Sequence, residues 1–239
     1  MADAPTLPQQ LKQYLDALRA AGVEYVAKAG PAPSRKSAPI VVASAVIPAV
    51  DPLAERRTNL KLLADGIQNC ARCLELFSTR TQTISGVGPI SAEVAFLGDG
   101  PDSVDDLAGQ PFRGDAGTWL TSALIALGLE REQVYLLNAT RCRAPGKRFP
   151  TAKECANCRD YLVHELELAR PKVICCLGTL TAQTLLQTTE SIATLRGKTF
   201  DHTGIPVICT FHPAYLLKNP KSSADAASDL EFLKRILGT

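Results

Sequence analysis

Residues 93–129 read EVAFLGDGPDSVDDLAGQPFRGDAGTWLTSALIALGL, and this stretch decides the fold. Its first six residues, 93–98, form a short apolar strand that opens onto a loop rich in glycine and aspartate. Residues 116–129 then place leucine and alanine at helical spacing, and Gly128 helps to close the helix. A buried strand followed by a loop and a helix is the repeating unit of a parallel α/β sheet.

The same alternation continues to the end of the sequence. Apolar strands are predicted at 133–138, 172–178 and 205–213, and helices at 151–169, 179–187 and 225–237. This pattern predicts a single α/β domain with a central four-stranded parallel sheet and helices on both faces. Because the carboxyl ends of parallel strands meet at one rim, the loops after Gly98, Asn138, Gly178 and Thr210 are expected to lie together.

The predicted α/β domain spans residues 53–239 and begins with a helical pattern over 53–76. An N-terminal extension, residues 1–28, contains leucines at helical spacing within 7–27 that predict one short helix, which Gly22 ends. Residues 29–52 are rich in proline, alanine and serine, which is typical of a flexible or extended linker.

Composition narrows the class of protein. The chain has 239 residues, 46% of them hydrophobic, and a formal net charge of +2, so nucleic acid would have to bind a local basic face. We expect a cytoplasmic monomer without a membrane partner, because no apolar run approaches the roughly 18 residues of a membrane span and the N-terminus lacks a signal-peptide pattern. The absence of a Walker loop argues against phosphoryl transfer.

Eight cysteines require an explanation in a reducing compartment, where spaced cysteines indicate metal or redox chemistry. Cys70 and Cys73 form one CxxC motif, and Cys155 and Cys158 form another. Spacing alone suggests tetrahedral zinc, although the two pairs lie much further apart than in a compact zinc module. The apolar strands hold three more cysteines, which we assign to the core: Cys175, Cys176 and Cys209.

Three rim loops carry distinctive sequences: GDGPDSVDDLAGQPFRGDAG (98–117), NATRCRAP (138–145) and FHPAYLLKNP (211–220). In this order they resemble the motifs of the family 4, iron–sulfur uracil-DNA glycosylases, which are G-E-(A/G)-P-G, G-x-P-F-x-G-x-A-G, N-x-x-K-C-R-P-P and H-P-(A/S)-Y-L-L-R. Residues 78–89 and the LRG of 195–197 are also similar to the family. The resemblance covers roughly residues 60–237.

The resemblance implies hydrolysis of the N-glycosidic bond of uracil in single- or double-stranded DNA. Free uracil would leave, and an abasic site would remain as the first product of base-excision repair. This cleavage develops positive charge on the sugar and negative charge on the uracil, so it requires a polar group near the sugar and a hydrogen-bond donor at the base. The base must also leave the stack and enter a pocket.

By this resemblance, His212 donates to uracil O2, Asn138 reads the uracil edge, and Phe112 stacks on the flipped base. An asparagine amide can donate to O4 and accept from N3–H, and cytosine presents the reverse pattern. Each residue also has a structural interpretation from its local sequence alone. His212 can cap a strand end, Asn138 can make a turn, and Phe112 can pack in the core.

The acidic residues depart from the family pattern. Asp99 stands where the family has Glu, and one methylene less can displace the carboxylate that acts on the water or the sugar cation. Asp102 replaces a glycine, and Gly100, assigned to substrate binding, holds the position of the catalytic Asp in another glycosylase family. Either Asp99 serves alone, or Asp102 or Asp105 shares its catalytic role. Asp105 and Asp106 match an acidic pair that flanks uracil C5, or they form a solvated loop that caps the next helix.

The family's four cluster ligands correspond to Cys70, Cys73, Cys142 and Cys158, which leaves Cys155 as an extra thiol. Four thiolates suit a [4Fe–4S] cluster, and zinc is the alternative metal. The cluster is expected to be structural because glycosidic hydrolysis needs no electron transfer.

Basic residues beside the predicted pocket are candidates for contacts with DNA phosphates, although such charges are often only solvated surface. They are Arg141, Arg143, Lys147, Arg148, Lys218 and Lys221. Leu216 and Leu217 are candidates to fill the gap that a flipped base leaves in the stack. The alternative functions are a weakened relative that binds damaged or single-stranded DNA without base release, and a metal-bearing module for another nucleotide ligand.

Overall fold

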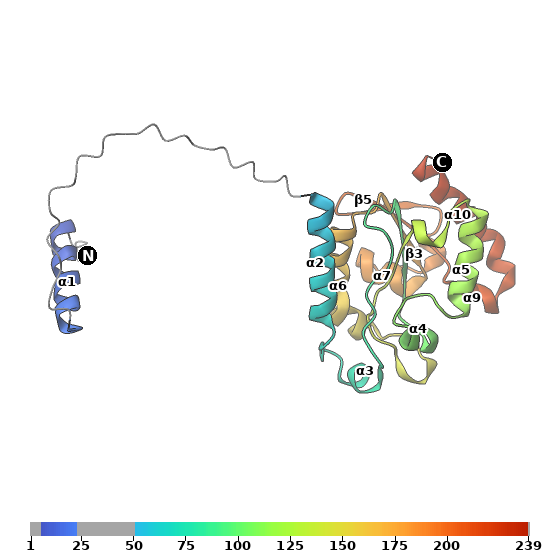
Figure 1. The fold of residues 1–239 in the computed structure, drawn as a ribbon. Helices are drawn as coiled ribbons and strands as arrows, with labels where there is room; N and C mark the ends of the chain where they lie inside the picture. Colours follow the sequence, from blue (N-terminus) through green and yellow to red (C-terminus); the bar gives the residue numbers. More distant parts are fainter. Residues whose placement is uncertain (1–5, 23–50, 239) are drawn as a thin grey trace. The chain divides into compact units, whose positions relative to one another are not determined.

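The computed structural model describes residues 6–22 and 51–238. The chain divides into two compact units, Met1–Pro48 and Ala49–Thr239. In the first unit, α1 (Leu7–Ala20) ends just before Gly22, as predicted, and starts at a capping box between Thr6 and Gln9 (Figure 1). Most of the predicted linker, residues 29–50, lies outside the described residues.

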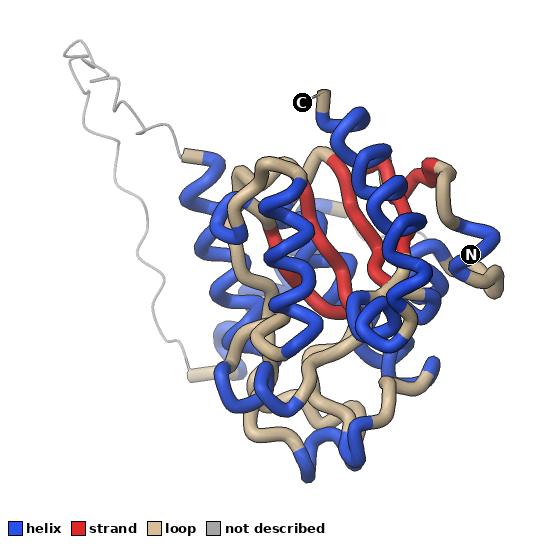
Figure 2. The backbone as a smooth tube through the Cα atoms, turned by 90° about the vertical axis from the view of Figure 1, so that its right-hand side faces the viewer, coloured by secondary structure: helices blue, strands red, loops and turns tan. Residues whose placement is uncertain are grey.

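Within residues 51–238, one five-stranded sheet has the order β2-β1-β3-β5-β4 (Figure 2). Its strands are β1 (Val94–Gly98), β2 (Tyr135–Asn138), β3 (Val173–Leu177), β4 (Thr199–His202) and β5 (Ile205–Thr210). The four predicted strands are confirmed, and each pairs in parallel with its neighbours among them.

The sequence analysis missed β4, which runs antiparallel to β5 at the edge of the sheet. Its residues, TFDH, are mostly exposed or half-buried, so they lack the apolar run that marks the other strands. The two-residue turn at Thr203 and Gly204 has positive φ at both positions, as a tight hairpin requires.

Nine α-helices and three 3₁₀ turns complete the unit formed by residues 51–238. The helices are α2 (Pro52–Ile67), α3 (Leu74–Thr79), α4 (Ser103–Ala108), α5 (Asp115–Ala126), α6 (Ala152–Ala169), α7 (Thr179–Leu186), α8 (Ile192–Leu195), α9 (Pro213–Lys218) and α10 (Ser223–Leu237). The 3₁₀ turns are η1 (Arg131–Gln133), η2 (Pro145–Lys147) and η3 (Pro220–Ser222).

Alternation along the strands divides the core into two layers. Ala95 and Leu97 face a cluster formed with α6, α7 and α8, and α2 packs outside α6. Val94 and Phe96 face the opposite cluster, formed with α5 and α10. Both faces of the sheet are therefore covered, as the sequence predicts (Figure 2).

Two predicted elements are wrong in extent, and both differences shape the rim. The helix predicted over 53–76 breaks between α2 and α3, where Cys73 is the extended N-cap of α3 with φ −125° and ψ 93°. The strand predicted over 205–213 ends at Thr210, because Pro213 starts α9 and His212 becomes its N-cap.

Candidate active site at the carboxyl edge of the sheet

Gly98, the last residue of β1, brings Phe112 and Asn138 together. Gly98 pairs with Asn138 across the β1–β2 ladder. A Cβ on Gly98 would lie 2.5 Å from Cζ of Phe112 and 2.6 Å from Oδ1 of Asn138. The edge of the aromatic ring and the side-chain amide therefore both lie directly against this glycine.

Gly178, which follows β3, likewise lies against both Asp99 and His212. A Cβ on Gly178 would lie 3.1 Å from Cβ of His212 and 3.5 Å from each carboxylate oxygen of Asp99. Gly178 also has a φ of +105°, which L side chains rarely adopt. Since Asp99 directly follows Gly98, all four predicted side chains approach one stretch of the rim.

Asn138 is 3% exposed, and its amide nitrogen Nδ2 has no hydrogen-bond partner among the described residues. Its side chain makes no turn hydrogen bond there either. A buried donor without a partner costs about 1–3 kcal/mol of folding free energy, which a protein tolerates where a ligand supplies the partner.

Phe112 has a left-handed backbone with φ +55°, which is strained for a bulky residue and costs about 1–3 kcal/mol. Its ring also packs in the core layer beside α5, so the core-packing interpretation holds together with the placement at the rim. A Cβ at Gly117 would lie 1.8 Å from the carbonyl oxygen of Phe112. Only glycine at position 117 lets α5 pack this closely against the strained turn.

Asp105 holds that turn from the other side. Its Oδ1 accepts a hydrogen bond from the backbone N–H of Arg113 at 2.6 Å, and Oδ2 accepts one from Asp102 N at 3.3 Å. Burial raises the pKa of the Asp105 carboxyl, while the hydrogen bond from Arg113 opposes the shift. The contacts of Asp105 are with the backbone around Phe112.

Asp106 and Asp102 also have partners within the protein. Asp106 accepts hydrogen bonds from the backbone N–H of Thr81 and from Nε of Arg143. Asp102 caps α4 by accepting from the N–H groups of Val104 and Asp105. The interpretation of Asp105 and Asp106 as a solvated loop is wrong, because both are nearly fully buried, and the helix cap is Asp102.

Asp99 is buried against the first turn of α7. Its Oδ1 accepts hydrogen bonds from both the backbone N–H and the hydroxyl of Thr181. These two bonds place the carboxylate at the N-terminal end of α7. The second oxygen, Oδ2, accepts no hydrogen bond from the described residues, so it remains available to a water or a sugar.

His212 caps α9 through one ring nitrogen. Nδ1 accepts a hydrogen bond from the N–H of Ala214 at 3.1 Å, which leaves Nε2 for another partner. Burial lowers the pKa of His212, and the charge of Asp99 opposes that shift. The capping interpretation and the donor interpretation therefore apply to different nitrogens of the same ring.

Gly100 lies where two later segments approach the first rim loop. A Cβ on Gly100 would lie 2.5 Å from Oγ1 of Thr140 and 2.7 Å from Cγ of Pro150. The backbone N–H of Thr140 donates to the carbonyl of Asp99, so the first two motifs are joined directly. A side chain at position 100 would therefore collide with both segments at this junction.

Four of the five motif cysteines occupy one region. Cys73 and Cys142 share a small buried cluster, and the pKa of Cys142 is raised by burial and further by the Cys70 and Cys73 thiols. Burial raises the pKa of Cys158 to about 11, and Cys142 and Cys70 are among its neighbours. Cys155 instead packs in the core layer beside α6. In the described residues no three Cys, His, Asp or Glu side chains converge closely enough to ligate a single metal ion.

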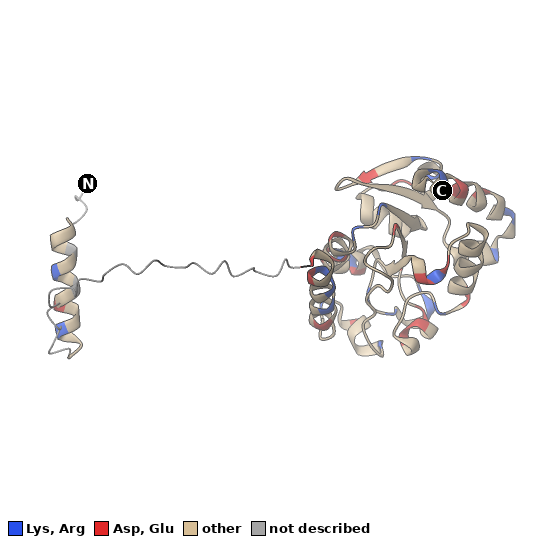
Figure 3. Cartoon of the chain, turned by 45° about the horizontal axis from the view of Figure 1, so that its top comes forward, with Lys and Arg blue, Asp and Glu red and all other residues tan. Residues whose placement is uncertain are grey.

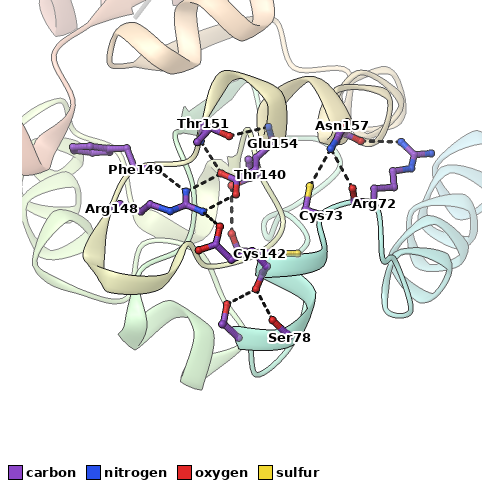
Figure 4. Close-up of polar contacts among 12 residues, drawn as sticks. Arg72, Cys73, Ser78, Thr140, Cys142, Arg148, Phe149, Thr151, Glu154 and Asn157 are labelled. Carbon is purple, nitrogen blue, oxygen red and sulfur yellow. Dashed lines mark hydrogen bonds and ion pairs between the residues drawn. The ribbon is translucent and has the colours of Figure 1, made fainter.

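Two of these four sulfurs accept a hydrogen bond from a side chain. Arg80 Nη1 donates to Cys142 at 3.0 Å, and Asn157 Nδ2 donates to Cys73 at 3.3 Å, as Figure 4 shows for the second pair. Donors to sulfur stabilise thiolates and orient them as ligands. The residues present therefore fit a group that four cysteine thiolates hold.

All three of the predicted DNA-binding arginines are engaged within the protein. Arg141 is fully buried in an ion pair with Glu165, so the prediction that it contacts phosphate is wrong. Arg143 donates to Asp106 at 3.1 Å, and Arg148 pairs with Glu154 at 2.7 Å and with Glu75 at 2.9 Å (Figure 4). Arg148 lowers the pKa of Glu154 to about 2 through their hydrogen bonds. These arginines join the cysteine region to its surroundings, which leaves them fewer free donors for phosphate.

Lys147 and Lys218 are exposed, and no ion pair is formed by either within the described residues. Figure 3 shows basic and acidic residues interspersed over the elements. Leu216 is 1% exposed, so the prediction that it enters the DNA stack is wrong, because it packs beneath α9. Leu217, the other candidate, is 48% exposed.

Two grooves lie away from this rim. One, of about 460 Å³, is lined by Glu93, Val94 and Leu129 at the amino-terminal edge of the sheet. The other, of about 400 Å³, lies between α2 and residues 85–90. Neither groove is lined by the predicted site residues. The side chains at the rim, rather than the volume of a groove, therefore identify the candidate site. None of the described helices is both long and apolar enough to span a bilayer.

Several residues of the site were not found from the sequence. Thr181 anchors Asp99, and its position in the first helical turn after Gly178 was the available signal. Arg80 and Asn157 donate to cysteine sulfurs, but neither lies within a quoted rim motif, and only the folded chain shows the contact.

Comparison with known proteins agrees with this geometry. The profile of the Uracil DNA glycosylase superfamily matches residues 85–235. A type-4 uracil-DNA glycosylase of Archaeoglobus fulgidus is 38% identical over 180 residues, covering 72% of this chain and 90% of the relative. One from Thermotoga maritima is 36% identical over 166 residues, covering 69% and 86%. The chain therefore belongs to the type-4 (family 4) uracil-DNA glycosylases of this superfamily.

Proposed function

We propose that this chain hydrolyses the N-glycosidic bond of uracil in DNA, releasing free uracil and leaving an abasic site as the first step of base-excision repair. The observation that carries the proposal is the buried Asn138 amide, whose Nδ2 lacks a partner beside the edge of the Phe112 ring. Uracil offers what this amide lacks, an acceptor at O4 beside a donor at N3.

Asn138 selects the base. Its Nδ2 donates to O4 and its Oδ1 accepts from N3–H, while Phe112 contacts the face of the pyrimidine. Cytosine would bring a donor to Nδ2 and an acceptor to Oδ1, leaving buried groups unpaired on both partners. A cost of about 1–3 kcal/mol for each unpaired group gives strong discrimination.

His212 stabilises the departing uracil. With Nδ1 occupied by the Ala214 N–H, the neutral ring carries its proton on Nε2. That N–H donates to uracil O2 as negative charge develops in the transition state. The lowered pKa of His212 keeps this neutral tautomer present at neutral pH.

Asp99 acts on the sugar side. Its carboxylate, held by Thr181, stabilises the positive charge on the sugar through Oδ2 and orients the attacking water. Asp105 is less suited to this role, since both of its oxygens accept hydrogen bonds from backbone N–H groups, and Asp102 caps α4. The anchor on α7 offsets the shorter reach of Asp relative to Glu.

Cys70, Cys73, Cys142 and Cys158 hold a structural [4Fe–4S] cluster, with zinc as the alternative metal. When bound, the group joins the segment before α3 to the second rim loop and to α6, and it contributes no electron to the reaction. The donors to Cys142 and Cys73 support this ligand set, and Cys155 packs in the core layer instead.

DNA phosphates contact Lys147 and Lys218, with Arg143 in a lesser role, and Leu217 fills the gap left by the flipped base. The substrate is uracil in single- or double-stranded DNA, and the protein acts as a monomer.

The test is release of uracil from oligonucleotides with uracil opposite guanine, opposite adenine and unpaired, followed by alkaline cleavage of abasic sites. The Asn138→Ala/His212→Ala variant, purified identically, controls for host glycosylases. We expect cleavage by the wild type alone. Tight binding of uracil-DNA without cleavage would select the weakened relative, which no comparison favours.

A further inference from the structure

The LRG motif of residues 195–197 has no part in the reaction described above, yet the side chain of its arginine is largely buried. Leu195 is buried in the core layer with α7 and α8, and Gly197 has a φ of +69° at the turn into β4. Between them, the Arg196 side chain is 16% exposed. A largely buried guanidinium needs polar or charged partners within the protein, because an unpaired buried charge is costly.

Arg196 has two kinds of partner. Its Nε donates to Oδ2 of Asp229 at 2.6 Å, and the same oxygen accepts from the hydroxyl of Thr210 at 2.6 Å. Its guanidinium carbon lies 4.5 Å from the centre of the Phe211 ring, within the range of a cation–π interaction. A weaker ion pair to Asp225 spans 3.4 Å.

The stack continues to α9. Phe211 and Tyr215 have ring centres 5.1 Å apart and planes inclined by 23°. These two rings bracket His212 in the sequence, and the carbonyl of His212 accepts hydrogen bonds from the N–H groups of Tyr215 and Leu216. Arg196 therefore fixes one side of the aromatic pair that holds the first turn of α9.

We propose that Arg196 is a positioning residue that, through Phe211, fixes the His212 imidazole in its Nδ1-accepting orientation. Lysine keeps the positive charge but lacks the planar face that stacks on the ring, so it is the informative replacement. The expected change in kcat rests on the proposed function. The expected change in the histidine spectrum rests on the geometry alone.

The experiment compares Arg196→Lys, Phe211→Leu and the double variant in the wild-type background. We expect each single change to lower kcat by about three- to tenfold with KM within about twofold, as misplacement of a catalytic group does. The double variant should be no slower than the slower single variant, because both act through one stack. Arg235→Lys is the matched control, since Arg235 lies 5.5 Å from the ring centre of Phe232 elsewhere on α10. Its kcat should equal that of the wild type.

The second readout is the ¹⁵N spectrum of histidine side chains, of which the chain has three. We expect Arg196→Lys and Phe211→Leu to shift or broaden the His212 signals and to leave those of His164 and His202 in place. Unchanged His212 signals, wild-type kcat in Arg196→Lys, or multiplicative losses in the double variant would each overturn the proposal. If the wild type released no uracil, the proposed function would fail, and the spectra would still decide the role of Arg196.

Discussion

The Nδ1 atom of His212 accepts a hydrogen bond from the backbone N–H of Ala214 across 3.1 Å. A nitrogen that accepts carries no proton, so this single contact fixes the tautomer and places the remaining N–H on Nε2. Protonation of the ring would put a proton on Nδ1, directly against the Ala214 N–H. The helix cap thus disfavours the charged form by the same geometry that prepares the donor.

The pH dependence of kcat follows from this arrangement. Burial lowers the pKa of His212, so the acidic limb should lie below the ordinary histidine value of about 6.5. The unfolded chain binds the proton more readily than the folded one, so stability from this site also falls as pH falls below that value. Rates between about pH 4.5 and 8 test this. His212→Gln should lose the limb, and an identical limb in that variant would assign it to another group.

Replacing Asn138 separates activity from stability. Asn138→Ala should lower kcat at least about tenfold, because it removes the groups that read uracil. It should not lower the melting temperature, because it also removes a buried donor that lacks a partner. Asn59→Ala on α2 serves as the control for an asparagine outside the site. A lower melting temperature with normal kcat would make the amide structural.

The two buried aspartates should behave differently. Asp99→Asn should lower kcat by about a hundredfold, because it removes charge beside the sugar while the amide can still contact Thr181. Asp105→Asn should lower kcat only several-fold and also lower stability by about 1.5–3 kcal/mol, because it weakens the bond to the Arg113 N–H. Kinetics with chemical denaturation measure both. Equal losses of kcat at full stability would return Asp105 to the chemistry.

The sequence predicted the parts of the fold that depend on apolar runs. The four parallel strands are mostly buried, so their apolar runs were visible in the sequence. The β4 strand is a largely exposed edge strand without an apolar run, so the sequence analysis missed it. Motif order also predicted that the loops carrying Phe112, Asn138 and His212 follow strands of one sheet at its carboxyl edge, because parallel strands bring their carboxyl ends to one rim.

Side-chain partners could not be predicted, because charge is visible in a sequence and pairing is not. Arg148 looked free for phosphate, yet Glu154 and Glu75 engage it. Asp102 and Asp105 were predicted as catalytic candidates, and the sequence did not show that each also accepts hydrogen bonds from backbone N–H groups. Whether a charged side chain meets a partner depends on the three-dimensional packing of distant segments, and the spacing of residues in the sequence does not reveal that packing.

The cysteines of α6 provide a matched pair for the cluster. Cys158→Ala should abolish absorbance near 400 nm and reduce bound iron, because it removes one of the four proposed ligands. Cys155→Ala should retain both, since Cys155 packs in the core layer. Iron, sulfide and zinc analysis after anaerobic purification measures this. Full iron in Cys158→Ala, or loss of iron in Cys155→Ala, would make Cys155 the ligand and Cys158 the core residue. Stoichiometric zinc without iron would favour the alternative metal.

Adjacent leucines on α9 distinguish a core residue from a DNA contact. Leu216→Ala should destabilise the protein by about 2–5 kcal/mol, because its side chain is 1% exposed. Leu217→Ala should leave stability within about 0.5 kcal/mol, because Leu217 is 48% exposed. Its effect should appear instead as slower uracil release from double-stranded DNA, with the rate on single strands unchanged, because only a duplex leaves a gap when a base flips. Equal rates on duplex DNA for Leu217→Ala and the wild type would exclude the wedge from α9.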